Sequence, residues 1–348
     1  SNDFPAQGQQ INIHWNQLWD LLEPAGYVWM YLASVDTVSQ CNRLDSVKIW
    51  NCCVNRKNAY INDTVISNDS IFIGSPTVLN GTITINNDIT VAAGNNIFIA
   101  PEAKIVVNPP FTFTIKYRTV KAGCAFMWDG IYITDSNAKI EIENSTVQDA
   151  YNAVNSANGG KFTLHHTNFY NNYTSVLARN YVNALIPPLP RHKGSIYACY
   201  FGQSGTTGLI APYLNAKPRY GIFANNVYML TIGDSSSSGN TNTFNTLFCG
   251  IASFNSSLGV YNNSFINIKN TGLCTIYPGD YTNVQCETAV HSVRTNLLIA
   301  NSSILNIGGS YTNTYSGNSF DNTSSGIYTY KTTSRIRNNS FSNTADAI

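Results

Sequence analysis

The sequence predicts an all-β fold, a right-handed parallel β-helix with 21–22 residues in each coil. First, the phrase Asn-x-Phe-x-Asn, followed by a small residue and Ile, occurs at 318–327 and again at 339–348. Second, looser copies keep the step from Phe to the aliphatic residue seven positions later. Third, short β-branched segments bounded by Gly, Asn, Asp and Pro recur from Tyr60 onward without helical periodicity.

The apolar positions of this phrase define the expected core. Equivalent positions lie 21 or 22 residues apart, which predicts inward-facing columns of stacked side chains. The copies are Phe244 with Ile251, Phe169 with Val176, Val147 with Val154, and Phe320 with Ile327. One column should contain Phe244, Phe265, Phe320 and Phe341. A β-sandwich or a propeller is the alternative, but a propeller blade takes about 40 residues.

Two sets of asparagines accompany the Phe column. One set lies two residues before the Phe, at Asn242, Asn263, Asn318 and Asn339. The other lies two residues after it, at Asn171, Asn267, Asn322 and Asn343. Asn side chains in stacked strands can bond to one another from coil to coil, so we expect Asn ladders. Surface glycan sites and ordinary turn residues are the alternatives.

Composition limits the classes of partner. Charged residues make up 11% of the chain, against about 25% in an average domain. The net charge of +1 argues against a nucleic-acid or anionic-membrane partner. No apolar run approaches the roughly 18 residues that a membrane-spanning segment needs. The surface should therefore owe its polarity to Asn, Ser and Thr.

Eight cysteines occur, none in a pair with zinc-like spacing. Their even number favours an oxidising compartment and at least one disulfide. Cys274 with Cys286, and Cys41 with Cys52 or Cys53, are candidate local pairs. Buried free thiols are the alternative for the remaining three, Cys124, Cys199 and Cys249.

The chain divides into an N-terminal cap region, 1–60, and a β-helix, 61–348, of ten to thirteen coils. The cap should contain a short amphipathic helix near Trp15–Leu22, then strand material from Tyr27 to Leu32. The chain ends as a new repeat begins, so we expect further C-terminal modules in the full-length protein. Its first residues lack signal-peptide features, as in a mature or trimmed protein.

Three stretches break the repeat, at Tyr181–Lys193, Asp234–Asn240 and Gly272–Glu287. The middle one reads as a flexible turn. The other two are insertions, which in solenoids form loops that often lie on the working face.

The segment Cys124-Ala-Phe-Met-Trp128-Asp-Gly-Ile131 resembles a phrase of large secreted β-helix proteins of the Bacteroidota. The Asn-Ser-Phe phrases resemble the repeat of the pectin-lyase-like superfamily, over roughly residues 75–348. The resemblance implies an extracellular or outer-membrane-surface location and export by a type IX system. The sorting domain that such export uses is not in this sequence. The fold also serves polysaccharide lyases, hydrolases, adhesins and tail-spike fibres, so it does not fix the function.

Catalytic phrases of that superfamily are absent from the sequence. These are the Arg-x-Pro-x-x-Arg phrase of pectate lyases and the Asp-rich and Gly-His-Gly phrases of polygalacturonases. Asp129, Asp149, Glu141 and Glu143 are the candidate acids. Glu141 and Glu143 should share the solvent face of one strand. An exposed acidic pair is the commoner outcome of such an arrangement, and a structural Ca²⁺ site, which would need a third ligand, is the alternative. Otherwise the sequence indicates neither a metal nor a cofactor, and it gives no catalytic constellation.

Two groups of residues are candidates for ligand binding. The first is the basic loop Arg191, His192 and Lys193, whose alternative is a solvated loop. The second is a set of tyrosines outside the inward columns, which can stack on sugar rings or form protein interfaces, with ordinary cross-strand packing as the alternative. Four of these are the binding candidates: Tyr170, Tyr173, Tyr328 and Tyr330. Others in the set are Tyr200, Tyr213, Tyr220 and Tyr261.

The sequence thus favours a non-enzymatic adhesin or structural stalk that binds a glycan or a cell-surface protein. A lyase or glycoside hydrolase acting on an acidic polysaccharide is the alternative, motivated by the basic loop and by the usual activity of the fold.

Overall fold

The computed structural model describes residues 27–35, 42–50, 60–68, 78–92, 94, 96–179, 194–206, 208–227, 230–234, 239–254, 256–268, 288–293, 304–307, 317–330 and 333–345. The chain forms two compact units, residues 1–56 and 57–348. In the first, β1 (Tyr27–Val35) pairs antiparallel with β2 (Asn42–Trp50). The strand predicted from Tyr27 is therefore confirmed, whereas the predicted helix lies outside the described residues.

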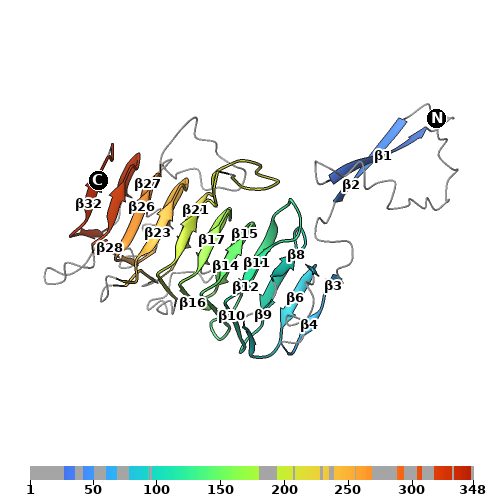
Figure 1. Cartoon of the computed structure of the whole chain (residues 1–348), viewed down its shortest axis with the longest axis horizontal. Helices are drawn as coiled ribbons and strands as arrows, with labels where there is room; N and C mark the ends of the chain where they lie inside the picture. The colour runs from blue at the N-terminus through green and yellow to red at the C-terminus, as the bar shows by residue number, and fades with distance from the viewer. Residues whose placement is uncertain are drawn as a thin grey trace. The chain divides into compact units, whose positions relative to one another are not determined.

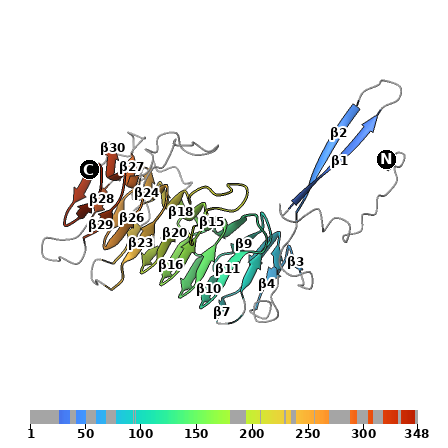
Figure 2. The ribbon, with the colours of Figure 1, turned by 45° about the horizontal axis from the view of Figure 1, so that its top comes forward.

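The second unit is a parallel β-helix with three all-parallel sheets, as predicted (Figures 1 and 2). The eleven-stranded sheet contains, in spatial order, β3 (Tyr60–Asn62), β5 (Val78–Asn80), β8 (Ile97–Ile99), β11 (Thr119–Ala122), β14 (Thr146–Gln148), β17 (Asn168–Tyr170), β20 (Tyr200–Gly202), β23 (Asn242–Asn245), β26 (Asn263–Ile266), β29 (Ser319–Asp321) and β32 (Ser340–Ser342).

The ten-stranded sheet contains β4 (Val65–Ile66), β6 (Thr82–Ile85), β9 (Lys104–Val107), β12 (Trp128–Ile133), β15 (Ala150–Ala157), β18 (Thr174–Arg179), β21 (Tyr220–Asn225), β24 (Cys249–Phe254), β27 (Thr288–Val293) and β30 (Ser325–Tyr330). The nine-stranded sheet contains β7 (Ile89–Val91), β10 (Thr112–Lys116), β13 (Lys139–Glu143), β16 (Lys161–His165), β19 (Ser195–Tyr197), β22 (Leu230–Ile232), β25 (Leu258–Val260), β28 (Ile304–Ile307) and β31 (Thr333–Ile336).

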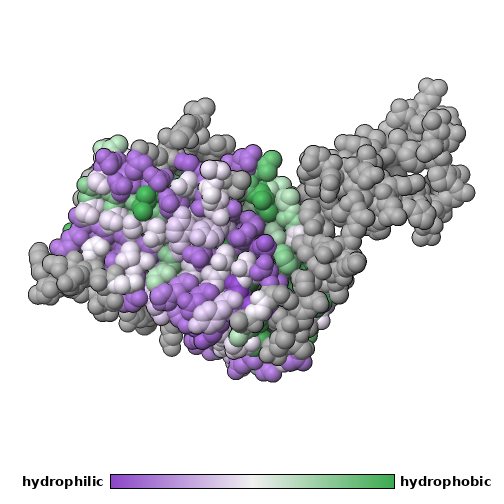
Figure 3. All heavy atoms as spheres, in the orientation of Figure 1, coloured by the Kyte–Doolittle hydropathy of each residue, from purple (hydrophilic) through white to green (hydrophobic). Residues whose placement is uncertain are grey.

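The strands form because buried and outward residues alternate along them. In β13, Ile140 and Ile142 are fully buried while Lys139, Glu141 and Glu143 face outward. The strands β6, β9 and β16 show the same alternation, and their apolar residues fill the interior between the three sheets. The described surface in Figure 3 is largely purple to white, as expected for a chain whose polar residues are mostly uncharged.

The predicted Phe column is confirmed. Strand pairing aligns Phe169, Phe201, Phe244, Phe265, Phe320 and Phe341 in one file. Successive rings are stacked, with centroids 4.7–5.1 Å apart. This distance matches the spacing between strands of a sheet, so each ring lies directly over the next.

A ladder of asparagines runs beside the Phe column, as predicted from the positions two residues before each Phe. Asn242 Nδ2 donates to Asn263 Oδ1 at 2.8 Å, and Asn263 Nδ2 donates to Asn318 Oδ1 at 2.9 Å. Asn318 Nδ2 continues the series to Asn339 Oδ1 at 2.9 Å. The first three side chains are buried, so the ladder satisfies polar groups where water does not reach them.

The second set of asparagines combines two of the expected roles. Asn171, Asn267, Asn322 and Asn343 all have φ between 50° and 57°, a left-handed conformation that Asn tolerates well. Asn322 Nδ2 also donates to Asn267 Oδ1 at 2.6 Å, and Asn267 Nδ2 donates to Asn245 Oδ1 at 3.2 Å. These residues therefore turn the chain and link neighbouring coils at the surface.

The three cysteines that the structure describes, Cys124, Cys199 and Cys249, are buried free thiols. Burial raises the pKa of the Cys199 thiol to about 12, so this thiol stays protonated and unreactive at neutral pH. The candidate disulfide partners at 41, 52, 53, 274 and 286 lie outside the described residues.

The buried carboxyl of Asp149 should destabilise the fold by an amount that depends on pH. It is 8% exposed in the turn between β14 and β15, and burial raises the pKa of its carboxyl, although Gln148 and Lys121 lower it. Because the folded-state pKa is raised, stability should fall as pH rises from the unfolded pKa of about 3.9 through the folded value.

We therefore expect Asp149→Asn to raise the free energy of unfolding by about 1 kcal/mol at pH 7. Asn accepts the left-handed backbone at this position, where φ is 62°. Near pH 3 the two proteins should be equally stable, since the carboxyl is then protonated in both states. Urea unfolding at the two pH values checks this, and a gain of equal size at both would contradict it.

Candidate functional site

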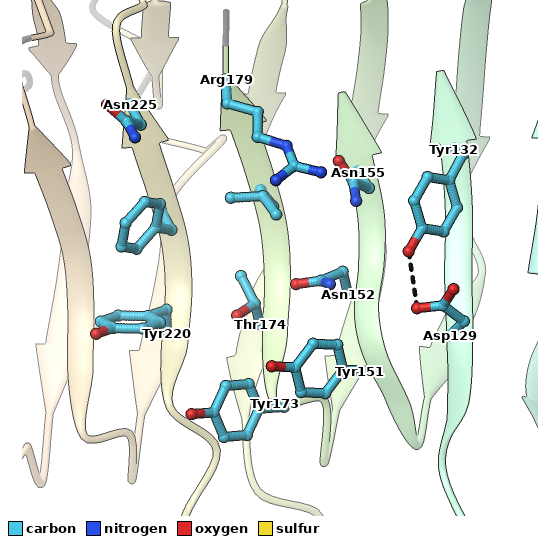
Figure 4. Close-up of a pocket in the computed structure, with 12 residues that line it drawn as sticks. Asp129, Tyr132, Tyr151, Asn152, Asn155, Tyr173, Thr174, Arg179, Tyr220 and Asn225 are labelled. Atoms are coloured by element: carbon cyan, nitrogen blue, oxygen red, sulfur yellow. Dashed lines mark hydrogen bonds between the residues drawn. The ribbon is translucent and has the colours of Figure 1, made fainter. Parts of the chain in front are cut away.

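A cavity of about 360 Å³ opens on the outer face of the ten-stranded sheet, across β12, β15, β18 and β21 (Figure 4). We call it the β12–β21 pocket. Its described lining residues are Asp129, Tyr132, Tyr151, Asn152, Asn155, Tyr173, Thr174, Leu177, Arg179, Tyr220, Phe223 and Asn225. Its volume lies within the range of about 300–1,000 Å³ that is typical of small-ligand sites.

A β-bulge shapes one side of the pocket. The register between β12 and β15 shifts between Gly130 and Ile131. These two residues pair with Asn152 and Val154, so β15 has one extra, unpaired residue at this point. Gly130 has φ of 137°, and a Cβ atom there would lie 1.7 Å from the carbonyl oxygen of Asn152. The glycine of the Trp-Asp-Gly-Ile phrase thus allows the close backbone approach that places Asn152 at the pocket wall.

Tyr132 and Asp129 form a hydrogen-bonded pair on β12. The Tyr132 hydroxyl donates to Asp129 Oδ1 at 2.7 Å, which Figure 4 shows as a dashed line. Burial raises the pKa of Tyr132, and the bond to Asp129 raises it further, while a bond to Asn155 and the charge of Arg179 lower it. The phenol therefore stays protonated at neutral pH and acts as a donor that orients the carboxylate.

The side-chain oxygen of Asn155, which lines the pocket, lacks a hydrogen-bond partner in the described part of the structure. The residue is 2% exposed, and its Oδ1 is buried with no hydrogen-bond partner among the described residues. A buried acceptor left in this state costs about 1–3 kcal/mol. Such a cost is explained when a ligand supplies the missing donor.

Three tyrosine rings stack at one end of the pocket. The Tyr173 ring lies 4.9 Å from the ring of Tyr151 and 4.5 Å from that of Tyr213. Tyr213 comes from the loop between β20 and β21, and this loop reaches back to β12, since Met127 N donates to Ala211 O at 2.8 Å. The loop thus brings a ring from a later coil to the pocket.

The predicted tyrosines do not form one site. Tyr173 lines the pocket but is 4% exposed, and it packs against Met127 and Leu209. Tyr170 lies on the eleven-stranded sheet beside Tyr200, with ring centroids 5.2 Å apart.

Tyr328 and Tyr330 both lie on β30, at the far end of the ten-stranded sheet. Tyr328 is half-buried against the cluster that contains Phe223 and Phe254. The side chain of Tyr330 is outside the described part of the structure, and so are Arg191, His192 and Lys193.

The pair Glu141 and Glu143 shares the outer face of β13, as predicted. Each carboxylate has a lysine partner, Lys139 for Glu141 and Lys116 for Glu143, the latter at 2.7 Å. Within the described ranges, no group of three or more His, Cys, Asp or Glu is placed to hold a metal ion. In the same ranges, no helix has the length and apolar character that crossing a membrane requires.

Sequence reasoning missed the pocket and the loop of residues 203–219. Phe201 and Phe244 are neighbours in the column although 43 residues separate them, so this coil contains an insertion. The missing Asn-x-Phe phrase in this interval was the available signal. No family model, curated protein or solved structure matches the chain.

Proposed function

We propose that this chain is an extracellular or cell-surface β-helix protein that binds a glycan through the β12–β21 pocket. It would act as an adhesin or a structural stalk, with the stacked coils as its rigid support. The resemblance around Trp128 to secreted proteins supports export, and a type IX route belongs to the same proposal. The pocket itself is the observation that carries the proposal.

The chemistry of the pocket suits a sugar ring. Tyr151 supplies partly exposed aromatic surface, while Asn152, Asn155 and Thr174 supply amides and a hydroxyl beside it. Sugars combine apolar ring faces with polar hydroxyls, so they need both kinds of contact in one site. In Figure 4, Asn152 and Thr174 lie above Tyr151 and Tyr173, and Asn155 lies beside the end of the Arg179 side chain.

Hydrolysis is a less suitable function for the described lining. The usual glycosidase mechanism needs two carboxyl groups flanking the scissile bond, and Asp129 is the one carboxylate among the described lining residues. The polysaccharide lyase or hydrolase remains the alternative. Release of unsaturated products or reducing ends from pectin or alginate would favour it over simple binding.

Binding should depend on Tyr151. We expect Tyr151→Ala to weaken glycan affinity about tenfold, equivalent to about 1.4 kcal/mol, because Tyr151 is the partly exposed ring of its stack with the buried Tyr173. A glycan array should first identify ligands of the full chain, and titration calorimetry should then compare the variants. Tyr170→Ala is the matched control, since Tyr170 lies on a different sheet. Equal losses in both variants, or no glycan bound by the unmodified chain, would reject the pocket as the site.

A further inference from the structure

We infer that the β12–β21 pocket selects an uncharged, hydroxyl-rich sugar residue, and that Asn155 determines this selectivity by accepting a hydrogen bond from a ligand hydroxyl. This inference rests on the proposed glycan binding. It extends that proposal by naming the ligand class and the residue that recognises it.

The β12 and β15 side of the pocket presents acceptors. Asn155 Oδ1 is buried without a partner among the described residues, and it faces the same cavity as the Asp129 carboxylate. A carboxylate accepts hydrogen bonds and cannot donate them, and the amide oxygen has the same limitation. One oxygen of Asp129 already accepts from Tyr132. A ligand group that meets these two oxygens must therefore be a donor, which a sugar hydroxyl is and a uronate carboxylate is not.

The β18 and β21 side of the pocket presents a hydrogen-bond donor, Arg179. Figure 4 shows the Arg179 side chain extending across the upper part of the pocket toward Asn155, with Asn225 beyond it on β21. A guanidinium donates and never accepts, so a ligand atom that meets it must be an acceptor. Hydroxyl groups both donate and accept, and a ring with several of them can satisfy both sides at once.

Charge within the pocket supports the same ligand class. Asp129 and Arg179 are the acidic and the basic residue of the described lining, and both act on Tyr132 electrostatically, in opposite directions. Their charges offset each other, so the pocket offers no net attraction to an anionic sugar. An anionic group would also approach the Asp129 carboxylate, which would repel it.

A purely structural role for Asn155 makes a different prediction. Asn155→Leu removes the bond between this side chain and Tyr132, which destabilises the fold, and it also removes the buried oxygen without a partner among the described residues, which stabilises the fold. The two effects oppose each other, so the thermal midpoint of unfolding should change little. The substitution should instead weaken glycan binding. A loss of affinity without a loss of thermal stability distinguishes a role in recognition from a role in folding.

The experiment uses the full chain and two glycan panels of matched length, neutral cello-, xylo- and manno-oligosaccharides and acidic oligogalacturonates and oligoalginates. We expect the unmodified chain to bind a neutral ligand at least tenfold more tightly than any acidic one. Asn155→Leu should weaken that binding at least tenfold while the melting temperature holds. Asn245→Leu, an asparagine on the outer face of the eleven-stranded sheet, should bind as the unmodified chain does.

The outcomes separate the two proposals. If the unmodified chain binds no glycan of either panel, the proposed function fails and this inference fails with it. If it binds acidic glycans as well as or better than neutral ones, glycan binding stands and the inference is overturned. An Asn155→Leu variant that keeps full affinity, or that loses affinity only together with thermal stability, also overturns it.

Discussion

Truncation of Phe244 to alanine is expected to lower the free energy of unfolding by about 3–5 kcal/mol. The ring is fully buried, and it stacks on Phe201 and Phe265, each at 4.8 Å. It also lies so close to Gly221 that a Cβ atom there would be 2.6 Å from the ring. Neighbouring coils are fixed by their own hydrogen bonds, so they cannot collapse into the space that the ring leaves.

Equilibrium unfolding in guanidinium chloride measures this loss, with circular dichroism as the probe of strand content. Phe341→Ala is the matched control, because that ring is only partly buried and its described ring contact is Phe320 alone. We expect its cost to be below about half of the Phe244 value. Equal costs at the two positions would show that the column does not act as a packed core.

Replacement of Asn263 by leucine is expected to cost about 3 kcal/mol or more. Asn263 is 1% exposed, and its Nδ2 donates to Asn318 Oδ1 and to the backbone carbonyls of Ile232 and Tyr261. Its Oδ1 accepts from Asn242. Leucine has a similar size but none of these groups, so four partners, most of them buried, would each lose a hydrogen bond.

The same unfolding measurement, with Ser264→Ala as control, tests the ladder. Ser264 is the next residue on β26 and points outward, where its Oγ accepts from Ser319. We expect a change within about 0.5 kcal/mol for this surface position. A leucine at 263 that proves as mild as the alanine at 264 would mean that the buried ladder contributes little to stability.

These two columns are also the part of the fold that the sequence predicts well. Phe244 and Asn242 contact the equivalent residues of the next coil, Phe265 and Asn263. The repeated sequence therefore determines which residue types meet in each contact. A contact between identical residues of successive repeats can be predicted from the repeat alone, without the positions of other segments. The three-sheet arrangement follows from the same regular spacing of short strands.

The pocket could not be predicted in this way, because its residues meet across coils of unequal length. Tyr213 reaches the site through a loop inserted between β20 and β21, and this loop is held near the site by the bond from Met127 N to Ala211 O. The bulge beside Gly130 depends on the extra residue of β15, which alternation along one strand does not reveal. Asp129 was among the candidate acids, but its partner Tyr132 became evident only in the folded chain.

The self-complementary stacking has a consequence for how such a protein changes during evolution. Within the columns, Phe201, Phe244, Phe265 and Phe320 each have a Phe on both sides, and Asn263 and Asn318 each have an Asn on both sides. A tandem duplication or deletion of one whole coil in this part of the chain therefore leaves every remaining contact with a suitable neighbour. Slippage between similar DNA repeats would therefore alter the reach of the molecule in steps of one strand spacing, about 4.8 Å, while the recognition chemistry stays intact. Length and specificity can in this way be selected independently.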